Sequence, residues 1–339
     1  MSEIMTDPFA ADGFSLAELT VATNKLPNNP RLIQDSGIFA DQGVTTRSIL
    51  VEEQNGILNL LPSVPPGGPA TVGNVGKRKL RSFVIPHIPH DDVVLPSDVQ
   101  GVRAFGSASL ADTQNRLLLQ KVQTMRDKHG ITLEWMRVGA MKGILVDGDA
   151  ATILYNFYDQ FGITAKTVDF ALDDEDTEVR SKCLEVKRHI ETHLFSEVSS
   201  GVRAYVSPDF YDALTQHTQV KEAFKFYDAN QQNLAADMRS GFRFGDIEFI
   251  EYNGSATTPD GTVNKFIADG EGHAFPLGSA STFKTFYAPA DFNETVNTIG
   301  LPVYAKMEPR KFGRGWDLHT QSNPFPICLR PEVLVKLTQ

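Results

Sequence analysis

The chain is poor in cysteine and has no long hydrophobic run, and both absences limit what it can be. Its 339 residues include only two cysteines, Cys183 and Cys328, too few and too far apart for a thiolate metal cluster. We expect both to be reduced thiols of a cytosolic product. No stretch approaches the roughly 18 consecutive apolar residues of a membrane-spanning helix, and the acidic N-terminus lacks the features of a secretory signal. Neither membrane insertion nor secretion is expected.

An excess of positive charge is also missing. The chain carries 42 Asp and Glu residues against 32 Lys and Arg residues, a formal net charge of −10. Nucleic-acid binding needs clustered Lys and Arg to neutralise phosphates, so this balance argues against such a role. The basic cluster Lys77, Arg78 and Lys79 is too short to reverse the field, and a solvated loop surface is its simpler interpretation.

Common catalytic and nucleotide-binding motifs are absent too. The sequence has no G-x-S-x-G, no G-x-x-x-x-G-K-[ST], no G-x-G-x-x-G after a predicted strand and no H-E-x-x-H. The strongest candidate site is the stretch FVIPHIPHDDVVLP, residues 83–96, which contains His87, His90, Asp91 and Asp92. Imidazole nitrogen and carboxylate oxygen are ligands that zinc and manganese prefer. A metal-dependent hydrolase is therefore one hypothesis.

The local sequence favours a different interpretation of these four residues. His87 and His90 each follow a proline, which favours an extended chain. Residues three positions apart on a strand lie on opposite faces, a poor arrangement for binding one metal ion. We therefore expect a structural or interfacial polar strand with no catalytic, cofactor or metal site. Protonation of the histidines would make some of its contacts sensitive to pH.

Hydrophobic patterning predicts an α+β chain with a two-stranded arm and a long helix. Residues 45–54 and 77–88 have the β-branched, alternating pattern of strands, and a Gly/Pro-rich stretch joins them. Such an arm buries too little surface to be stable alone, so it must lie on something else. Over residues 113–142, apolar side chains and His129 recur at helical spacing and predict a helix on the order of 45 Å. Asp112 is its expected N-cap and Gly143 its terminator.

The rest of the chain alternates between predicted helices and strands. Residues 143–162 read as a hairpin, and the acids before residue 179 favour the start of a helix over about 174–196. A strand and a single helix follow, the helix over about residues 209–224, and the C-terminal part is strand-like. We find no internal repeat, so the parts are expected to share an α+β core.

Several stretches together resemble one known family, the lambda-type major head protein (major capsid protein E) family of tailed bacteriophages. None is a catalytic signature, but as an ordered set covering most of the chain from residue 85 onward they are specific. They are IPHIPHDDVVLPSDVQGVRAFG, GILVDGDAATILYNFYDQFG, VRAYVSPDFYDALTQHTQVKEAF, FGDIEFIEYNG, FPLGSASTFKTFYAPADFNETVNTIGLPVYAKM and GWDLHTQSNPFPICLRPEVLVKL.

The resemblance implies the tailed-phage (Hong Kong 97-type) major capsid protein fold. This α+β fold has an N-terminal arm, an extended hairpin called the E-loop, a peripheral domain with a long spine helix, and an axial domain. The implied boundaries are 1–45 for the N-terminal arm, 46–106 for the E-loop, 107–200 for the peripheral domain, 201–300 for the axial domain and 301–339 for the return to the peripheral domain. Residues 83–96 would then be the returning strand of the E-loop.

The same resemblance implies a structural protein and no enzyme. Its copies would assemble as hexamers and pentamers into an icosahedral head shell that encloses double-stranded DNA without sequence-specific binding. The protein would be a virion component assembled in the host bacterial cytoplasm. A scaffolding protein and a portal are implied partners, with a decoration protein as a further option. No long N-terminal helical scaffolding segment is recognisable, which implies that the scaffolding protein is a separate chain.

Two site expectations follow, and two alternatives stay open. His87, His90, Asp91 and Asp92 would make contacts within or between subunits. Lys77, Arg78 and Lys79 would meet acidic side chains on the adjacent subunit, with Asp173 to Asp176 and Glu178 as one candidate. The alternatives are an encapsulin-like protein compartment of the same fold and the metal-dependent hydrolase.

Overall fold

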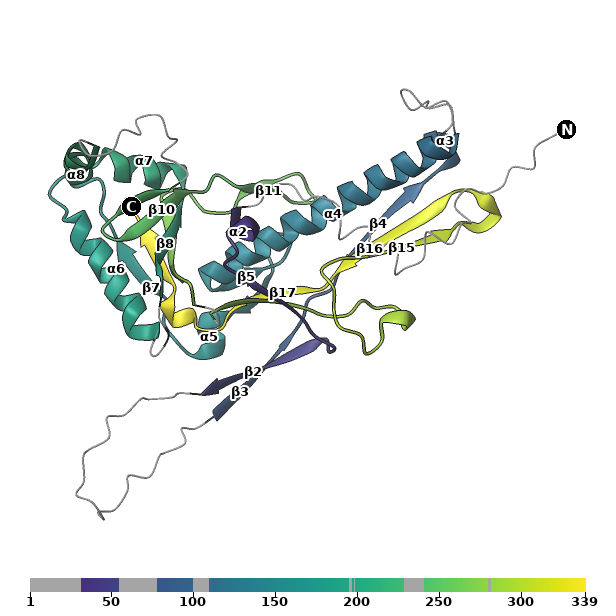
Figure 1. Cartoon of the computed structure of the whole chain (residues 1–339), viewed down its shortest axis with the longest axis horizontal. Coiled ribbons are helices and arrows are strands. Elements are labelled where there is room, and N and C mark those ends of the chain that lie inside the picture. The colour runs from purple at the N-terminus through teal and green to yellow at the C-terminus, as the bar shows by residue number, and fades with distance from the viewer. Residues whose placement is uncertain are drawn as a thin grey trace, which may run out of the picture. The chain divides into compact units, whose positions relative to one another are not determined.

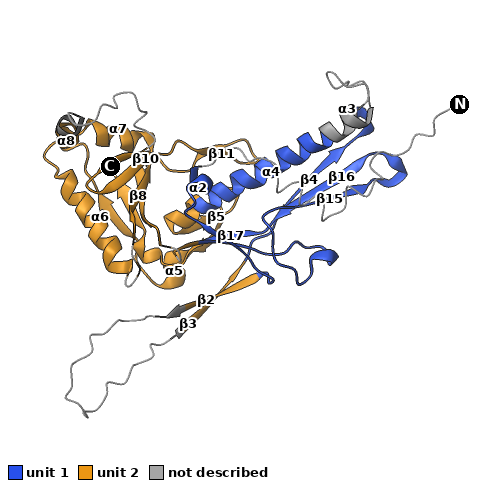
Figure 2. Cartoon of the chain, in the orientation of Figure 1, with its two compact units in different colours: residues 1–47, 85–137, 284–326 blue, residues 48–84, 138–283, 327–339 orange. Residues whose placement is uncertain are grey.

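Figure 1 shows a computed structural model of the chain. The structure describes residues 32–54, 78–99, 110–194, 197, 199–228, 241–279 and 282–339. The chain divides into two compact units, each built from separate stretches of sequence (Figure 2). Unit 1 comprises residues 1–47, 85–137 and 284–326, and unit 2 comprises residues 48–84, 138–283 and 327–339. Within the described ranges, no helix combines the length and the apolar character needed to cross a bilayer.

The expected long helix is present as α4 (Leu110–Lys142). Its 33 residues correspond to roughly 50 Å of helix. It begins at Leu110, so Asp112 lies inside the helix and is not its N-cap. Gly143 ends it as expected, with a left-handed φ of 80° that favours glycine. Residues 110–137 of α4 belong to unit 1.

A three-stranded antiparallel sheet packs against α4 in unit 1 (Figure 1). Its strands are β15 (Tyr304–Pro309), β16 (Trp316–Ser322) and β4 (Ile88–Val94), in that order. The shared core consists of aliphatic and methionine side chains, three from the expected helical stripe on α4 and four from the strands. These residues are Val94, Leu118, Val122, Met125, Ala305, Met307 and Leu318.

Unit 1 also contains a sheet that joins distant parts of the chain. β1 (Ala40–Gly43) runs parallel to β14 (Phe283–Tyr287), and β17 (Pro324–Cys328) lies on the other side of β14. The remaining short elements of this unit are α2 (Leu32–Asp35), α3 (Pro96–Val99), η3 (Asn293–Thr295) and η4 (Lys311–Gly313).

A six-stranded mixed sheet forms the centre of unit 2. Its order is β7 (Lys166–Asp169), β18 (Val335–Thr338), β13 (Glu271–Leu277), β8 (Gly201–Val206), β10 (Ile247–Glu251) and β9 (Phe242–Phe244). Its helices are α6 (Val179–Leu194), α7 (Pro208–Gln216), α8 (Thr218–Asp228) and the short η5 (Pro331–Val333). Strand β18 lies between β7 and β13, so the end of the chain completes a sheet begun far earlier.

Three hairpins complete unit 2. The expected arm is the antiparallel pair β2 (Ser48–Gln54) and β3 (Arg78–Val84), and its tip, residues 55–77, lies outside the described residues. The hairpin expected over residues 143–162 is present as β5 (Ile144–Val146) and β6 (Ile153–Asn156), but its second part is wrong, because residues 157–161 form the short helix α5 (Phe157–Phe161). The third hairpin is β11 (Ser255–Thr257) and β12 (Val263–Lys265).

Three sequence expectations about these elements need correction. The helix expected at residue 174 begins at Val179, after the acidic run and not within it. The single helix expected over 209–224 is two helices, because His217 adopts an extended ψ of 136° between them. Residues 88–94 do not belong to the arm, since β4 pairs with β16 and the returning arm strand ends at Val84.

The two units also cut across the expected domain boundaries. Residues 138–283 are one continuous part of unit 2, so the expected boundary between 200 and 201 falls inside it. Residues 327–339 likewise belong to unit 2, separately from residues 301–326. The division into N-terminal arm, E-loop, peripheral domain and axial domain therefore stays a prediction.

Candidate functional site

The polar stretch at β4 has a separate partner for each of its four candidate residues. His87 Nδ1 lies 2.9 Å from Asn323 Oδ1, and His90 Nε2 lies 3.1 Å from Lys128 Nζ. Asp91 pairs with His319 on the neighbouring strand β16. Asp92 Oδ1 accepts a hydrogen bond from Val93 N and lies 3.6 Å from Lys121 Nζ on α4. These side chains therefore connect β4 to its neighbours and do not converge on one point.

A polar seam, buried at His129 and exposed at Lys128, joins β4 and β16 to α4. The Lys128 ammonium donates to His90 Nε2, which requires a neutral imidazole with its proton on Nδ1. His129, on the next position of the helix, is 4% exposed, and its Nε2 lies 2.9 Å from Thr320 Oγ1. The rings of His90 and His129 lie 6.3 Å apart. Two neutral imidazoles and one ammonium thus share a small volume.

Burial determines the protonation of this seam. Burial and the nearby Lys128 charge lower the pKa of His90, and the carboxylates of Asp92 and Asp91 only partly offset this. Burial, with a smaller contribution from the charges of neighbouring His90 and His319, lowers the pKa of His129 to about 4. Both imidazoles are therefore neutral near pH 7.

Lys121 holds the end of β4 from the same face of α4. Its ammonium donates to the carbonyl oxygen of Val93 and lies 3.4 Å from Asp98 Oδ2 and 3.6 Å from Asp92 Oδ1. Asp98 also accepts from Leu95 N at 3.1 Å, and this backbone bond is the main cause of its lowered pKa. The carboxylates are partly exposed, so solvent screens both ion pairs. Lys121 acts as a positioning residue for the strand.

This arrangement does not suit metal-dependent hydrolysis. In the part of the chain that the structure describes, no three His, Cys, Asp or Glu side chains are grouped so that they could hold a metal ion. Sequence reasoning did not pair β4 with Lys121, Lys128 or His319, because these partners lie on other elements. One signal pointed to His129, which falls in the apolar stripe of α4, where a polar residue needs a partner.

One face of the base of the arm packs against β6 and α5 within unit 2. Phe83 is fully buried, and its ring centroid lies 5.4 Å from that of Tyr155 and 6.2 Å from that of Phe157. The Tyr155 hydroxyl donates to Val84 O at 3.0 Å and accepts from Val84 N at 2.9 Å. Arg81 donates through Nε to Gln160 O at 2.7 Å. The hydroxyl thus pairs with the backbone of Val84 at the end of β3. Phe83 and Arg81 attach this face of the arm to β6 and α5.

The opposite face of the arm carries exposed aliphatic side chains. Alternation along the paired strands places Leu50, Leu80 and Val84 together on this face, where they are 64%, 64% and 62% exposed. We call these three residues the bare arm face. Of the basic cluster, Lys79 is exposed on β3, Arg78 begins that strand, and Lys77 lies outside the described residues.

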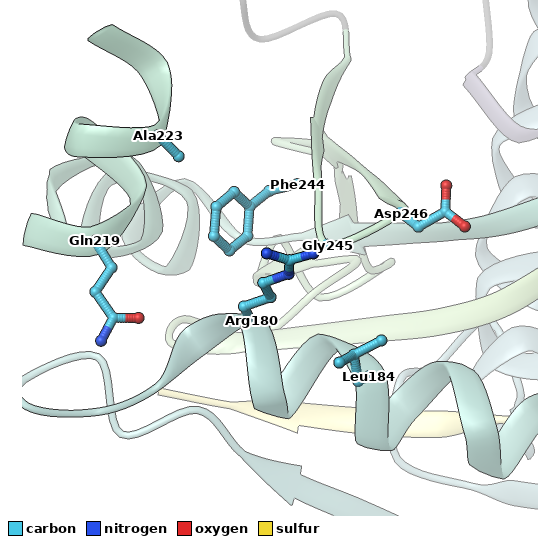
Figure 3. Close-up of a pocket in the computed structure, with 7 residues that line it drawn as sticks. All are labelled: Arg180, Leu184, Gln219, Ala223, Phe244, Gly245 and Asp246. Carbon is cyan, nitrogen blue, oxygen red and sulfur yellow. The ribbon is translucent and has the colours of Figure 1, made fainter. Parts of the chain in front are cut away.

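A groove of about 470 Å³ lies between α6, α8 and the turn from β9 to β10. Figure 3 shows Arg180 of α6 beside the ring of Phe244, with Gly245 and Asp246 at the turn. The Asp246 carboxylate is paired with Lys187, which lowers its pKa through that hydrogen bond and charge. The residues that line the groove include no serine, cysteine or histidine. The charged groups of the lining are the Arg180 guanidinium and the Asp246 carboxylate.

Comparison with known proteins identifies the family. The family model described as phage major capsid protein E matches residues 15–339. The chain belongs to the phage major capsid protein E family. It is 30% identical to the major capsid protein of Pseudomonas phage KPP10, over 97% of this chain and 98% of that protein. It is 28% identical to the major capsid protein of Salmonella phage Felix O1, over 95% of each chain.

A solved structure agrees on the fold of this capsid protein. The putative capsid protein of a prophage of E. coli CFT073 has a TM-score of 0.55 and 16% identity, with 89% of each chain covered. The chain therefore has the tailed-phage capsid fold, as the sequence resemblance implied. It is a structural protein of the head shell and not an enzyme, which rejects the metal-dependent hydrolase.

Proposed function

We propose that copies of this major capsid protein meet as hexamers and pentamers in an icosahedral shell around double-stranded DNA, and that each arm lies across the adjacent copy. The bare arm face carries this proposal. A two-stranded ribbon is marginally stable alone, and in each copy one face of its base packs on Tyr155 and Phe157 while the other stays exposed. A neighbouring copy that covers this face would bury apolar surface at every interface of the shell.

The basic cluster near the arm tip is proposed to add an electrostatic contact. Lys77, Arg78 and Lys79 of one copy would meet the acidic run Asp173 to Asp176 and Glu178 of the next. The described carboxylates of that run are exposed, before the start of α6. Exposed pairs contribute about 0–1 kcal/mol each, too little to decide whether one copy folds. Repeated around a closed shell, the same contribution would decide whether assembly completes.

Charge reversal with a rescue variant tests this contact. Changing Lys77, Arg78 and Lys79 together to Glu should leave the circular dichroism and melting of the subunit nearly unchanged and abolish or misdirect shells seen by electron microscopy. Reversing Asp173, Asp174 and Asp176 to Lys in the same chain should restore shells. Normal heads from the triple reversal at low salt, where screening is weakest, would show that the cluster has no such role, as would unfolding of its subunit.

Partners and location follow from the proposed assembly. A separate scaffolding protein, a portal and a decoration protein are the proposed partners, and the host bacterial cytoplasm is the proposed place of assembly. We propose no cofactor, no metal and no sequence-specific contact with the enclosed DNA. Shell formation by the chain expressed with and without the other head proteins of its phage distinguishes a required scaffolding partner from unaided assembly.

A further inference from the structure

A second group of exposed aliphatic side chains lies on unit 1, in the segment between β14 and β15. Val296 and Ile299 are each 65% exposed, and Leu301 is 41% exposed. We call residues 291–301 the aliphatic loop. Single exposed aliphatic residues are ordinary, but a group on one short segment is typical of an interaction site.

Hydrogen bonds hold the aliphatic loop in one conformation. Thr295 Oγ1 donates to Ala290 O at 2.7 Å, and Thr298 Oγ1 donates to Thr295 O at 2.7 Å. Gly300 N donates to Val44 O at 2.9 Å. A Cβ at Gly300 would lie 2.0 Å from Tyr287 O, so the backbone is tightly packed at this point. A partner would therefore meet a pre-organised surface, at a low cost in conformational entropy.

The charges beside the aliphatic loop are already paired within unit 1. Asp291 Oδ1 lies 3.6 Å from Arg47 Nη1, and Glu294 Oε1 lies 3.2 Å from Lys306 Nζ. The loop exposes Val296, Ile299 and Leu301 together with the polar side chains of Asn293, Asn297 and Thr298. An apolar surface is the complementary partner of the three aliphatic side chains, because an isolated charge placed against them would lose hydration without gaining a counter-charge.

The bare arm face has matching chemistry and lies on the other unit of the chain. Closed rings of more than two identical copies use heterologous contacts, in which two different patches of the same chain meet. We infer that the bare arm face of one copy packs on the aliphatic loop of the next copy in the shell. This inference rests on the proposed assembly and names where the base of the arm makes its contact.

Engineered disulfides test the pairing directly. The native thiols of Cys183 and Cys328 are fully buried, and burial raises the pKa of each to about 12, so they stay unreactive. The double variant Leu50→Cys with Ile299→Cys, assembled into shells and oxidised, should give a ladder of covalent dimers, trimers and larger species on a denaturing gel. Mixed single variants should stop at dimers, because each copy then offers one thiol.

A matched control keeps the exposure of the thiol constant. Val263, on β12, is 63% exposed, so Leu50→Cys with Val263→Cys should give at least tenfold less ladder than the Ile299 combination. Equal ladders overturn the pairing. The pairing is also overturned by an intramolecular disulfide alone, by a cross-link from the introduced arm thiol to another head protein, or by well-formed shells without a ladder. Each of these three results leaves the proposed assembly intact. Failure of the wild-type chain to form shells with its scaffolding partner overturns this inference together with the proposed assembly.

Discussion

The histidine seam makes a quantitative prediction about pH. Above pH 6.5, neither the folded nor the unfolded chain carries a proton on His129. Between pH 6.5 and about 4, only the unfolded chain binds that proton, because burial lowers the pKa of His129 in the fold to about 4. The free energy of unfolding therefore falls as the pH is lowered through this window. Below it both states are protonated and the loss is complete.

The size of the effect follows from the same values. The difference between 6.5 and about 4, at about 1.36 kcal/mol for each pKa unit, gives a total loss of about 3 kcal/mol. About 1.4 kcal/mol of this is expected by pH 5.5 and about 2.5 kcal/mol by pH 4.5. His129→Gln removes the titration while its amide keeps a group that can bond Thr320. The variant should therefore lack this part of the pH dependence.

Tryptophan fluorescence provides an assay that is selective for unit 1. The chain has two tryptophans, Trp135 on α4 and Trp316 on β16, and both belong to this unit. Urea unfolding of the unassembled subunit would be followed by their emission at pH 7, 5.5 and 4.5. His193→Gln, on α6 in unit 2, is the matched control and should retain the wild-type pH dependence.

The reasoning is refuted if His129→Gln and the wild type lose the same free energy of unfolding between pH 7 and 4.5. A nuclear magnetic resonance titration of the folded subunit in which the His129 imidazole takes up its proton near pH 6.5 would refute it independently. The pKa of His90 should be lowered in the same direction, because His90 is partly buried and its protonation would place a second positive charge beside Lys128 Nζ at 3.1 Å.

Two further predictions concern unit 2. Phe83→Ala should lower the free energy of unfolding by about 3–5 kcal/mol, because it empties the aromatic contact at the base of the arm; circular dichroism during urea unfolding measures this, and a loss below about 1 kcal/mol would contradict the described packing. Gly245→Ala should cost more than Gly162→Ala, since both glycines have a left-handed φ but a Cβ at residue 245 alone would lie 2.4 Å from Cys183 Cβ. The same urea unfolding assay compares the two variants, and equal losses of unfolding free energy would mean that the turn moves away from α6 freely.

Local patterns were enough to predict the elements that depend on near neighbours in the chain. The stripe on α4, the glycine after it and the alternation in the arm strands each reflect periods of a few residues, and all three are present. The break at His217 was missed because the residues on either side have helical patterns, and one residue with an extended ψ separates them.

Strand partners and site contacts were harder to predict from the sequence, because alternation shows which face a side chain occupies and not which strand lies beside it. The pattern of residues 88–94 suits the arm as well as it suits β16, yet Asp91 pairs with His319, 228 positions later in the chain. The contact of His90 with Lys128 spans 38 positions and depends on α4 packing over the sheet. Only the tertiary fold brings these groups together.

The discontinuous construction of unit 1 has a consequence for synthesis on the ribosome. Strand β1 pairs with β14 in a register that joins Ala40 to Lys284, and the last stretch of the unit ends at residue 326. From residue 47 to residue 326 the ribosome must add 279 residues, which takes roughly 14 to 56 seconds at about 5–20 residues per second. Throughout that interval the nascent chain lacks a complete unit 1. The contacts that hold the aliphatic loop, such as that of Gly300 N with Val44 O, are therefore not all formed. A chain that ends before residue 326 therefore cannot form the complete unit 1.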